Sequence, residues 1–214
     1  MTQRGKTFRL YIRGPNACFT RPEMKVERVS YEVPTPSAMR GVLEAIFWKP
    51  AFRWVIERID ILKPIRWETI RRNEIGTTQS PRSDYLIIEE RRQQRAALVL
   101  KDVAYIIHAH QELTGKEREG NDLKKLSAMF ERRADKGQCF HRPYLGTREF
   151  AVADFRLMEP DEEVKPIPQS KDLGWMLYDL DFTHPKNPQP LFFHAVMEHG
   201  TVSVPPPESE EVKR

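Results

Sequence analysis

One amphipathic helix with clear start and stop signals constrains the fold of this chain more than any other feature. Thr35 followed by Pro36 is the usual combination of an N-cap and a first helical turn, and Lys49-Pro50 ends the pattern. Between these signals the apolar residues recur at helical spacing: Met39, Val42, Leu43, Ile46 and Phe47. The pattern predicts a helix whose apolar stripe packs into the core.

Strand patterns surround this helix. Residues 8–13 alternate between apolar side chains and basic or aromatic ones, which is the period of a half-buried strand. Further extended segments are predicted at 27–33, 52–62, 65–75, 96–112, 174–182, 191–197 and 201–204, and a second helix, capped by Asn121, is predicted to run to about Lys136. The order strand, helix, strand, strand resembles the front half of a ferredoxin-like fold, which many RNA-binding domains share. The predicted fold class is α+β, with a ferredoxin-like (RRM-like) N-terminal domain and a small C-terminal antiparallel β-sheet subdomain.

Charge is distributed unevenly along the chain. The net charge is +4, but residues 6–72 hold fourteen Lys or Arg against seven Asp or Glu, whereas residues 159–181 hold two against seven. Aromatic residues lie between the early basic ones, which is typical of binding to a nucleic-acid backbone; a solvated surface is the alternative. The change in composition predicts three parts: a domain at 1–158, a β-subdomain at 159–204 and a disordered tail at 205–214.

Several classes of protein are disfavoured by composition. The longest apolar stretches are interrupted by charge well short of a membrane span, and no signal peptide is visible, so we expect a cytoplasmic protein without a membrane segment. Cys18 and Cys139 show neither CxxC spacing nor a histidine at zinc-finger spacing, which argues against a zinc site and a disulfide framework. We expect no cofactor and no bound metal.

Six stretches spread over nearly the whole chain resemble one known family. They are ACFTRPEMKVERVSYEVPTPSAMRGVLEAI from Ala17, FWKPAFRW from Phe47, LKPIRWETIRRNEIG from Leu62, RQQRAALVLKDVAYII from Arg92, RRADKGQCFHRPYLGTREF from Arg132 and DLGWMLYDLDF from Asp172. In these stretches and in their order the sequence resembles the CRISPR-associated family-five proteins of subtype I-C, also called the Dvulg subtype.

The resemblance implies a function and a set of partners. It implies metal-independent cleavage of the repeat hairpin of precursor CRISPR RNA, giving mature guide RNA. It also implies that the protein stays on the 5′ handle of the guide within the antiviral effector complex, beside the backbone and large subunits. The part at 1–158 would then be the RNA-binding and processing domain.

The resemblance also suggests catalytic positions. One characterised pattern in the family uses a tyrosine at the end of the first helix and an adjacent Lys-His pair on a later strand. Phe47 stands at the position of the tyrosine, and Ala109 and His110 stand at the pair. Phe47 has no proton to exchange and lies on the apolar stripe of its helix, which favours core packing. Lys49 is the nearest cation that can replace the lysine; its alternative role is to stabilise the helix C-terminus.

Two histidines on the predicted strand offer a substitute for the family pattern. His108 and His110 lie two residues apart, so both side chains are expected on one face, with Asp102 and Glu112 further along. Cleavage by the ribose 2′-hydroxyl needs a base, an acid and a cation, and imidazoles can exchange protons near neutral pH. Structural or solvent-facing histidines are the alternative. A divalent-ion site is a further alternative, for which no third ligand is identified.

Basic residues in the predicted loops and strands are candidates for RNA contact. Another possible approach to RNA is the turn that holds His141, Tyr144 and Gly146, although an ordinary tight turn would look the same. The candidate cations are Arg21, Lys25, Arg28, Arg66, Arg71, Arg72 and Arg148.

Three functions remain open at the level of sequence. The first is an endoribonuclease that makes guide RNA, with His110 as general base or acid. The second is a binding subunit that holds the 5′ handle with weak or no cleavage, which the replacement of the family tyrosine and lysine favours. The third, non-specific DNA binding, rests on charge alone and is compatible with either.

Overall fold

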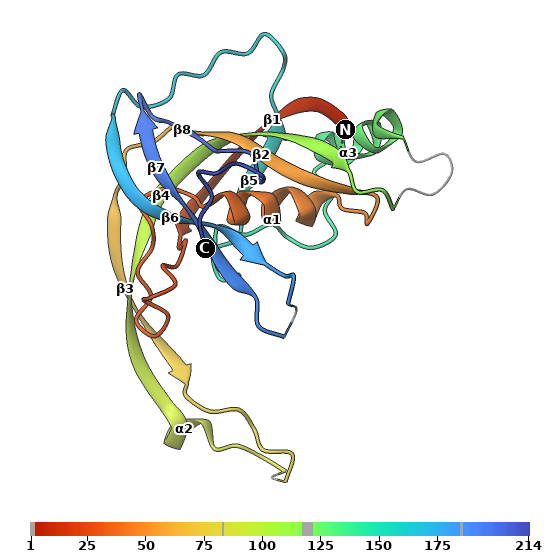
Figure 1. Cartoon of the computed structure of the whole chain (residues 1–214). Helices are drawn as coiled ribbons and strands as arrows, with labels where there is room; N and C mark the ends of the chain where they lie inside the picture. The colour runs from red at the N-terminus through yellow and green to blue at the C-terminus, as the bar shows by residue number, and fades with distance from the viewer. Residues whose placement is uncertain (1–2, 83, 117–121, 185) are drawn as a thin grey trace.

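Most of the protein is one curled antiparallel sheet (Figure 1). The computed structural model describes residues 3–82, 84–116, 122–184 and 186–214, and within these ranges the sheet has eight strands. The strands are β1 (Arg4–Ala17), β2 (Phe52–Ile61), β3 (Trp67–Ile75), β4 (Arg92–Leu113), β5 (Asp154–Leu157), β6 (Lys171–Asp181), β7 (Gln189–Glu198) and β8 (Thr201–Ser203). The helices are α1 (Pro36–Ile46), α2 (Ile88–Arg91) and α3 (Leu123–Asp135).

The strand order shows how the chain builds this sheet. Along the sheet the order is β5-β1-β4-β2-β8-β7-β6, and β3 pairs with the early part of β4 outside this path. The long strand β4 therefore has two parts, one paired with β3 and one between β1 and β2. Figure 1 shows the β3–β4 hairpin reaching away from the body of the protein, with α2 at its far part.

Helix α1 confirms the prediction from its start signals. The Thr35 hydroxyl oxygen accepts a hydrogen bond from the Ala38 backbone N–H at 3.3 Å, and Pro36 occupies the first turn. Its buried stripe consists of Pro36, Met39, Val42, Leu43, Ala45 and Ile46. The helix ends at Ile46, and the next residue, Phe47, has an extended backbone.

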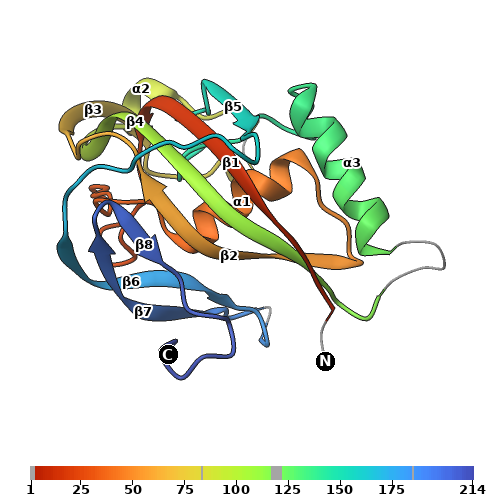
Figure 2. The same cartoon turned by 90° about the horizontal axis from the view of Figure 1, so that it is seen from above.

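Helix α3 begins with a different residue from the predicted one. The predicted cap, Asn121, lies outside the described residues, and Asp122 caps the helix by accepting a hydrogen bond from the Lys125 backbone N–H at 2.7 Å. Leu126 and Phe130 of this helix are fully buried. Helix α3 packs on β1, β4 and β5, and α1 packs on β2 and β6 (Figure 2).

The two helices cover one face of the sheet and leave the other face polar. The rings of Phe8 from β1, Trp54 from β2 and Phe130 from α3 meet edge to face, with centroids 4.7, 4.9 and 5.7 Å apart. Because side chains alternate along a strand, the neighbouring register positions Arg9 and His108 belong to the opposite face. The helices thus build the core, and the other face carries the titratable groups.

The C-terminal strands continue the same sheet. Strand β8 pairs with β2 on one side and with β7 on the other, so β6, β7 and β8 extend the sheet beyond β2. The division into a domain at 1–158 and a subdomain at 159–204 stays a prediction.

The end of the chain contacts the sheet. Phe192 of β7 and Lys213 form a β-bridge, with two backbone N–H···O hydrogen bonds of 2.7 Å each. Glu208 also accepts a hydrogen bond from the Arg53 guanidinium at 2.7 Å. These contacts connect residues near the chain end to the sheet, although none of the residues at 205–214 is buried, and the predicted tail stays a prediction.

The segment at 27–33 and the lengths of the helices bear on two further predictions. The segment at 27–33 is not a strand, because only Val29 and Ser30 form isolated bridges, with Leu98 and Thr20 respectively. None of the described helices is long and apolar enough to cross a membrane.

Candidate active site

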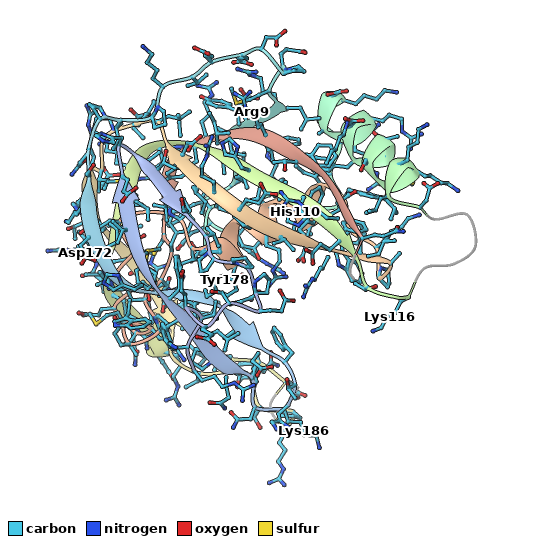
Figure 3. The ribbon with its side chains drawn as sticks, turned by 45° about the horizontal axis from the view of Figure 1, so that its top comes forward. Arg9, His110, Lys116, Asp172, Tyr178 and Lys186 are labelled. Atoms are coloured by element: carbon cyan, nitrogen blue, oxygen red, sulfur yellow. The ribbon has the colours of Figure 1, made fainter. Side chains whose placement is uncertain are left out.

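His110 lies near the middle of the sheet, on the face that the helices leave uncovered. It pairs in register with Thr7 of β1 and Val55 of β2. The next residue, Gln111, points the other way, since its side chain accepts a hydrogen bond from Ser127 of α3 at 3.1 Å. His110, labelled in Figure 3, is only 4% exposed, and carboxylates as well as apolar residues such as Val55 and Val204 lie around it.

Both nitrogens of the His110 ring are bound by carboxylates. Nδ1 lies 2.5 Å from Glu57 Oε1, and Nε2 lies 3.1 Å from Glu112 Oε1. Each carboxylate is in turn bound by an arginine: Arg4 Nη2 donates to Glu57 at 2.7 Å, and Arg53 donates to Glu112 from Nε at 2.9 Å and from Nη2 at 2.7 Å. The imidazole therefore lies at the centre of a chain of alternating acidic and basic groups.

The environment lowers the pKa of the Glu112 carboxyl. Partial burial acts to raise this pKa, but hydrogen bonds from His110 and Arg53, together with their charges, outweigh burial. The ionised form of Glu112 is therefore favoured.

A pocket of about 340 Å³ lies beside this imidazole. Its lining includes Arg4, Glu57, His110, Glu112 and Glu208. The pocket gives an arriving hydroxyl group a route to the ring. The contact to Glu112 is the longer of the two at the ring, so it is the one that such a hydroxyl displaces at lower cost.

His108 lies on the same face, in a separate set of contacts. Its Nε2 lies 2.6 Å from Asp60 Oδ2 and 3.0 Å from Arg58 Nη2. Thr201 donates to the other oxygen of Asp60 at 2.9 Å. Burial acts to raise the pKa of Asp60, but the hydrogen bond and charge of His108, with the charge of Arg58, lower it overall. The two histidines thus share a face as predicted, but each is held by its own carboxylates.

Phe47 and Lys49 lie on the other side of the sheet from His110. Phe47 is 2% exposed and stacks on Phe52 with ring centroids 5.5 Å apart, in the core between the sheet and the helices. The Lys49 ammonium lies 4.0 Å from the sulfur of Met129 in α3. The structure therefore does not bring these two side chains together with His110.

Three of the predicted RNA-contacting arginines form ion pairs within the part of the protein that the structure describes, and two of them, Arg28 and Arg72, share the same two carboxylates. The Arg72 side chain is only 12% exposed and pairs with Glu74 at 3.0 Å and with Glu149. Arg28 pairs with the same two carboxylates at 3.7 and 3.4 Å. Alternation along β3 explains the difference from Arg71, because Arg72 and Glu74 point toward the body and Arg71 points to solvent.

Arg21 is as exposed as Arg28, with 31% of each side chain accessible, and it pairs with Glu23 at 3.8 Å. Arg21 is half-buried and stacks over the Tyr31 ring, with its guanidinium carbon 4.5 Å from the centroid. The exposed residues are Lys25, Arg66, Arg71 and Arg148.

The sequence did not point to Glu57, Arg4 or Arg53 as neighbours of His110. Glu57 reaches the ring because the β2–β4 register shifts between Ile56 and Arg58. Residues 53, 55 and 57 alternate along one strand, so the sequence predicts that their side chains lie on one face. It does not predict which strand lies beside them. Asp102, which we expected further along the same strand face, pairs with Lys63.

A metal site receives no support from the side-chain positions. Within the part of the chain that the structure describes, no group of three or more His, Cys, Asp or Glu side chains is arranged to hold a metal ion.

Comparisons with known proteins agree with the sequence resemblance. The Cas5d family model, described as CRISPR-associated protein (Cas_Cas5), matches residues 7–205. A protein of Mannheimia succiniciproducens named CRISPR pre-crRNA endoribonuclease Cas5d is 51% identical, over 96% of this chain and 98% of its own length. A protein of the same name from Thermus thermophilus is 44% identical, over 94% of this chain and 92% of its own.

The fold matches as well. A solved structure titled "Crystal Structure of CRISPR-associated Protein" superposes with a TM-score of 0.75 over the full length of both chains, at 23% identity. The mixed α/β architecture, with a curled antiparallel sheet and few helices, is therefore that of a known CRISPR-associated fold. The length of the family match and the identity to both relatives lead to one conclusion: this chain belongs to the Cas5d family of CRISPR-associated proteins.

Proposed function

We propose that this protein is an endoribonuclease that cleaves precursor CRISPR RNA within its repeat hairpin. The observation that carries the proposal is the 51% identity, over nearly the whole chain, to a relative whose name states that activity. The polar sheet face with His110, Arg4 and Arg53 supplies groups suited to the reaction.

We further propose that the first part of the chain is a ferredoxin-like RNA-binding domain. The order β5-β1-β4-β2, with α1 between β1 and β2 and α3 between β4 and β5, supports this description. Strands β6, β7 and β8 then form the small C-terminal sheet.

The reaction that suits this face is attack by a ribose 2′-hydroxyl on the adjacent phosphate. The 2′-oxygen bonds to phosphorus and gives up its proton, and the bond to the 5′-oxygen breaks as that oxygen takes a proton. The products are a 2′,3′-cyclic phosphate and a 5′-hydroxyl, and side chains alone carry the proton transfers in this scheme.

His110 is our candidate for proton transfer. Glu57 holds Nδ1, which orients the ring as a carboxylate orients the histidine of a catalytic triad. Nε2 faces the longer contact, to Glu112, and the substrate hydroxyl would take that place. Arg4 and Arg53 lie next to these carboxylates and can stabilise the charge on the phosphorane.

The partners follow from the resemblance. We propose that the protein keeps the 5′ handle of the guide RNA and joins the backbone and large subunits of a subtype I-C effector complex. The exposed cations Lys25, Arg66, Arg71 and Arg148 are the proposed phosphate contacts.

A second function, guide binding without cleavage, is favoured by two features of the structure. Both nitrogens of His110 are occupied, and the residue at the family's tyrosine position, Phe47, is buried and has no proton to exchange. A protein of this kind would bind the processed handle and leave the RNA intact.

Incubation with its own repeat RNA in the presence of a chelator separates the two functions. We expect cleavage at one position, slowed about 10²- to 10⁴-fold by His110→Ala. His108→Ala is the matched control, because it changes the same side chain on the same strand face, and it should leave most of the rate. Tight binding of RNA that stays intact would instead support the second function.

A further inference from the structure

An exposed row of rings lies far from the face that carries His110. Phe140 is 86% exposed, and its ring is followed by those of His141 and Tyr144, with successive centroids 6.0 and 6.1 Å apart. His141 and Tyr144 are stacked, with an interplanar angle of 23°. We call the segment at 138–148, which follows α3, the aromatic loop.

The backbone of the aromatic loop is firmly held. Phe140 donates its N–H to the carbonyl of Ala45, near the end of α1, at 2.7 Å. Gly146 has φ +87 and passes so close to Cys18 that an added Cβ would lie 2.0 Å from the Cys18 carbonyl oxygen. The Arg142 guanidinium binds the carbonyls of Val152 and Ala153 at 2.8 and 2.7 Å. The Phe140 ring is therefore presented on a fixed backbone, and it gains nothing from burial in this chain.

A second exposed aromatic residue lies at the same end of α1. Trp48 follows the last residue of that helix by two positions and is 53% exposed. Because Phe140 is bonded to Ala45, the two aromatic residues flank one helix terminus.

The charge of the aromatic loop indicates what would cover these rings. From residue 135 to residue 149 the sequence contains Lys136, Arg142 and Arg148 against Asp135 and Glu149, and the cations of this stretch that are not bound to backbone carbonyls are Lys136 and Arg148. The last turn of α3 adds Arg132 and Arg133. Aromatic side chains set among cations are the pattern with which proteins hold single-stranded nucleic acid, since bases stack on the rings and phosphates pair with the cations.

We propose that the aromatic loop and Trp48 bind unpaired nucleotides that flank the RNA hairpin. Bases stack on Phe140, His141 and Trp48, and Lys136 and Arg148 contact the phosphates. This inference rests on the proposed function. Binding at the aromatic loop would extend the RNA contact to the side of the sheet opposite His110. The flank thereby adds affinity that the hairpin alone does not have.

Affinity for two RNAs tests this assignment. One is the repeat hairpin alone, and the other is the hairpin with its single-stranded flank carrying 2-aminopurine, whose fluorescence falls on stacking. Wild-type protein should bind the flanked RNA more tightly and quench the probe. Phe140→Ala and Trp48→Ala should each weaken binding of the flanked RNA about tenfold and leave hairpin affinity unchanged.

The chain offers matched controls for both substitutions. Phe182 and Trp175, which lie on or beside β6, are 56% and 54% exposed. Phe182→Ala and Trp175→Ala remove rings of the same kind and should change neither affinity. Phe140→Leu keeps apolar bulk without a π-face, so it should behave like Phe140→Ala. Far-UV circular dichroism checks that each variant is folded.

The outcomes separate the two proposals. If wild-type protein neither binds nor cleaves its repeat RNA, the proposed function fails and this inference fails with it. If wild-type protein cleaves but the flank advantage survives in Phe140→Ala and Trp48→Ala, only the aromatic loop is misassigned, and a protein subunit becomes the better occupant of these rings.

Discussion

The two carboxylates at His110 are not equivalent. Glu57 approaches Nδ1 at 2.5 Å, whereas Glu112 lies 3.1 Å from Nε2 and is held by two nitrogens of Arg53. Glu57 also accepts hydrogen bonds from Arg4 and Thr7, so both carboxylates are shared, and the difference between them is the distance to the ring. If His110 carries the chemistry, the two carboxylates should contribute unequally to it.

Glu57→Gln should lower the single-turnover cleavage rate about 10- to 100-fold. The reason is that an amide no longer stabilises the charged ring or fixes its tautomer. Glu112→Gln is the matched control and should cost less, because the substrate displaces that contact. Rates measured from pH 5 to 9 should show a changed pH profile for Glu57→Gln alone. Equal rates in wild type and Glu57→Gln would remove Glu57 from the mechanism.

Asp60 predicts a pH-dependent stability. Its pKa is lowered in the folded protein, so its ionised form contributes stability above the unfolded pKa of about 4, and this contribution is lost as pH falls through the folded pKa. Asp60→Asn should lower the free energy of unfolding by about 1–3 kcal/mol at pH 7, because Asp60 is buried and accepts hydrogen bonds from His108 and Thr201.

Urea unfolding of wild type and Asp60→Asn at pH 7 and pH 3 measures this difference. The deficit of the variant should shrink at pH 3, where wild-type Asp60 is protonated in the unfolded chain and loses its advantage. A deficit that is the same at both pH values would show that the carboxylate charge is not its source.

At the scale of elements, the β3–β4 hairpin shows how strand alternation sorts neighbouring arginines. Arg71 is exposed on the outer surface, and Arg72 points to the body, where it pairs with Glu74 and Glu149. The sequence identifies both as basic residues of a strand. It does not show which of the two alternating sets of side chains points toward the body of the protein. That choice depends on residues distant in the chain, among them Glu149.

The two arginines should therefore respond differently to substitution. Arg71→Ala should weaken RNA binding and reduce the salt dependence of the affinity by about one phosphate contact. Arg72→Ala should lower the free energy of unfolding by about 1–2 kcal/mol and change the salt dependence less. Affinity titrations at several salt concentrations, with urea unfolding in parallel, distinguish these effects. The reverse assignment of the two effects would contradict the orientation of β3.

Elements with local signals were predicted well, and elements that depend on distant partners were not. Helix α1 was found because Thr35 and Pro36 mark its start within the segment itself. The contacts of the chain end with Phe192 and Arg53 were not predicted, because both partners are distant in the sequence. The contact of Glu57 with His110 was missed for the same reason, since it depends on a register shift between β2 and β4.

For the whole molecule, the two faces of the sheet have different roles. One face, with α1 and α3, supplies the core, and Phe47 belongs to it. The other face carries His110 and its carboxylates beside a pocket. Phe47, at the position that the resemblance assigns to the family's tyrosine, and His110 therefore lie on opposite sides of the sheet.

Cleavage of a modified substrate tests the central claim most directly. Wild-type protein is incubated in chelator with its repeat RNA and with the same RNA carrying a single 2′-deoxyribose at the cleavage position. The account predicts that the unmodified RNA is cut at that position, leaving a 2′,3′-cyclic phosphate, and that the deoxy RNA stays intact although it binds equally well. Cleavage of both RNAs at the same rate would contradict attack by the 2′-hydroxyl and with it the role proposed for His110.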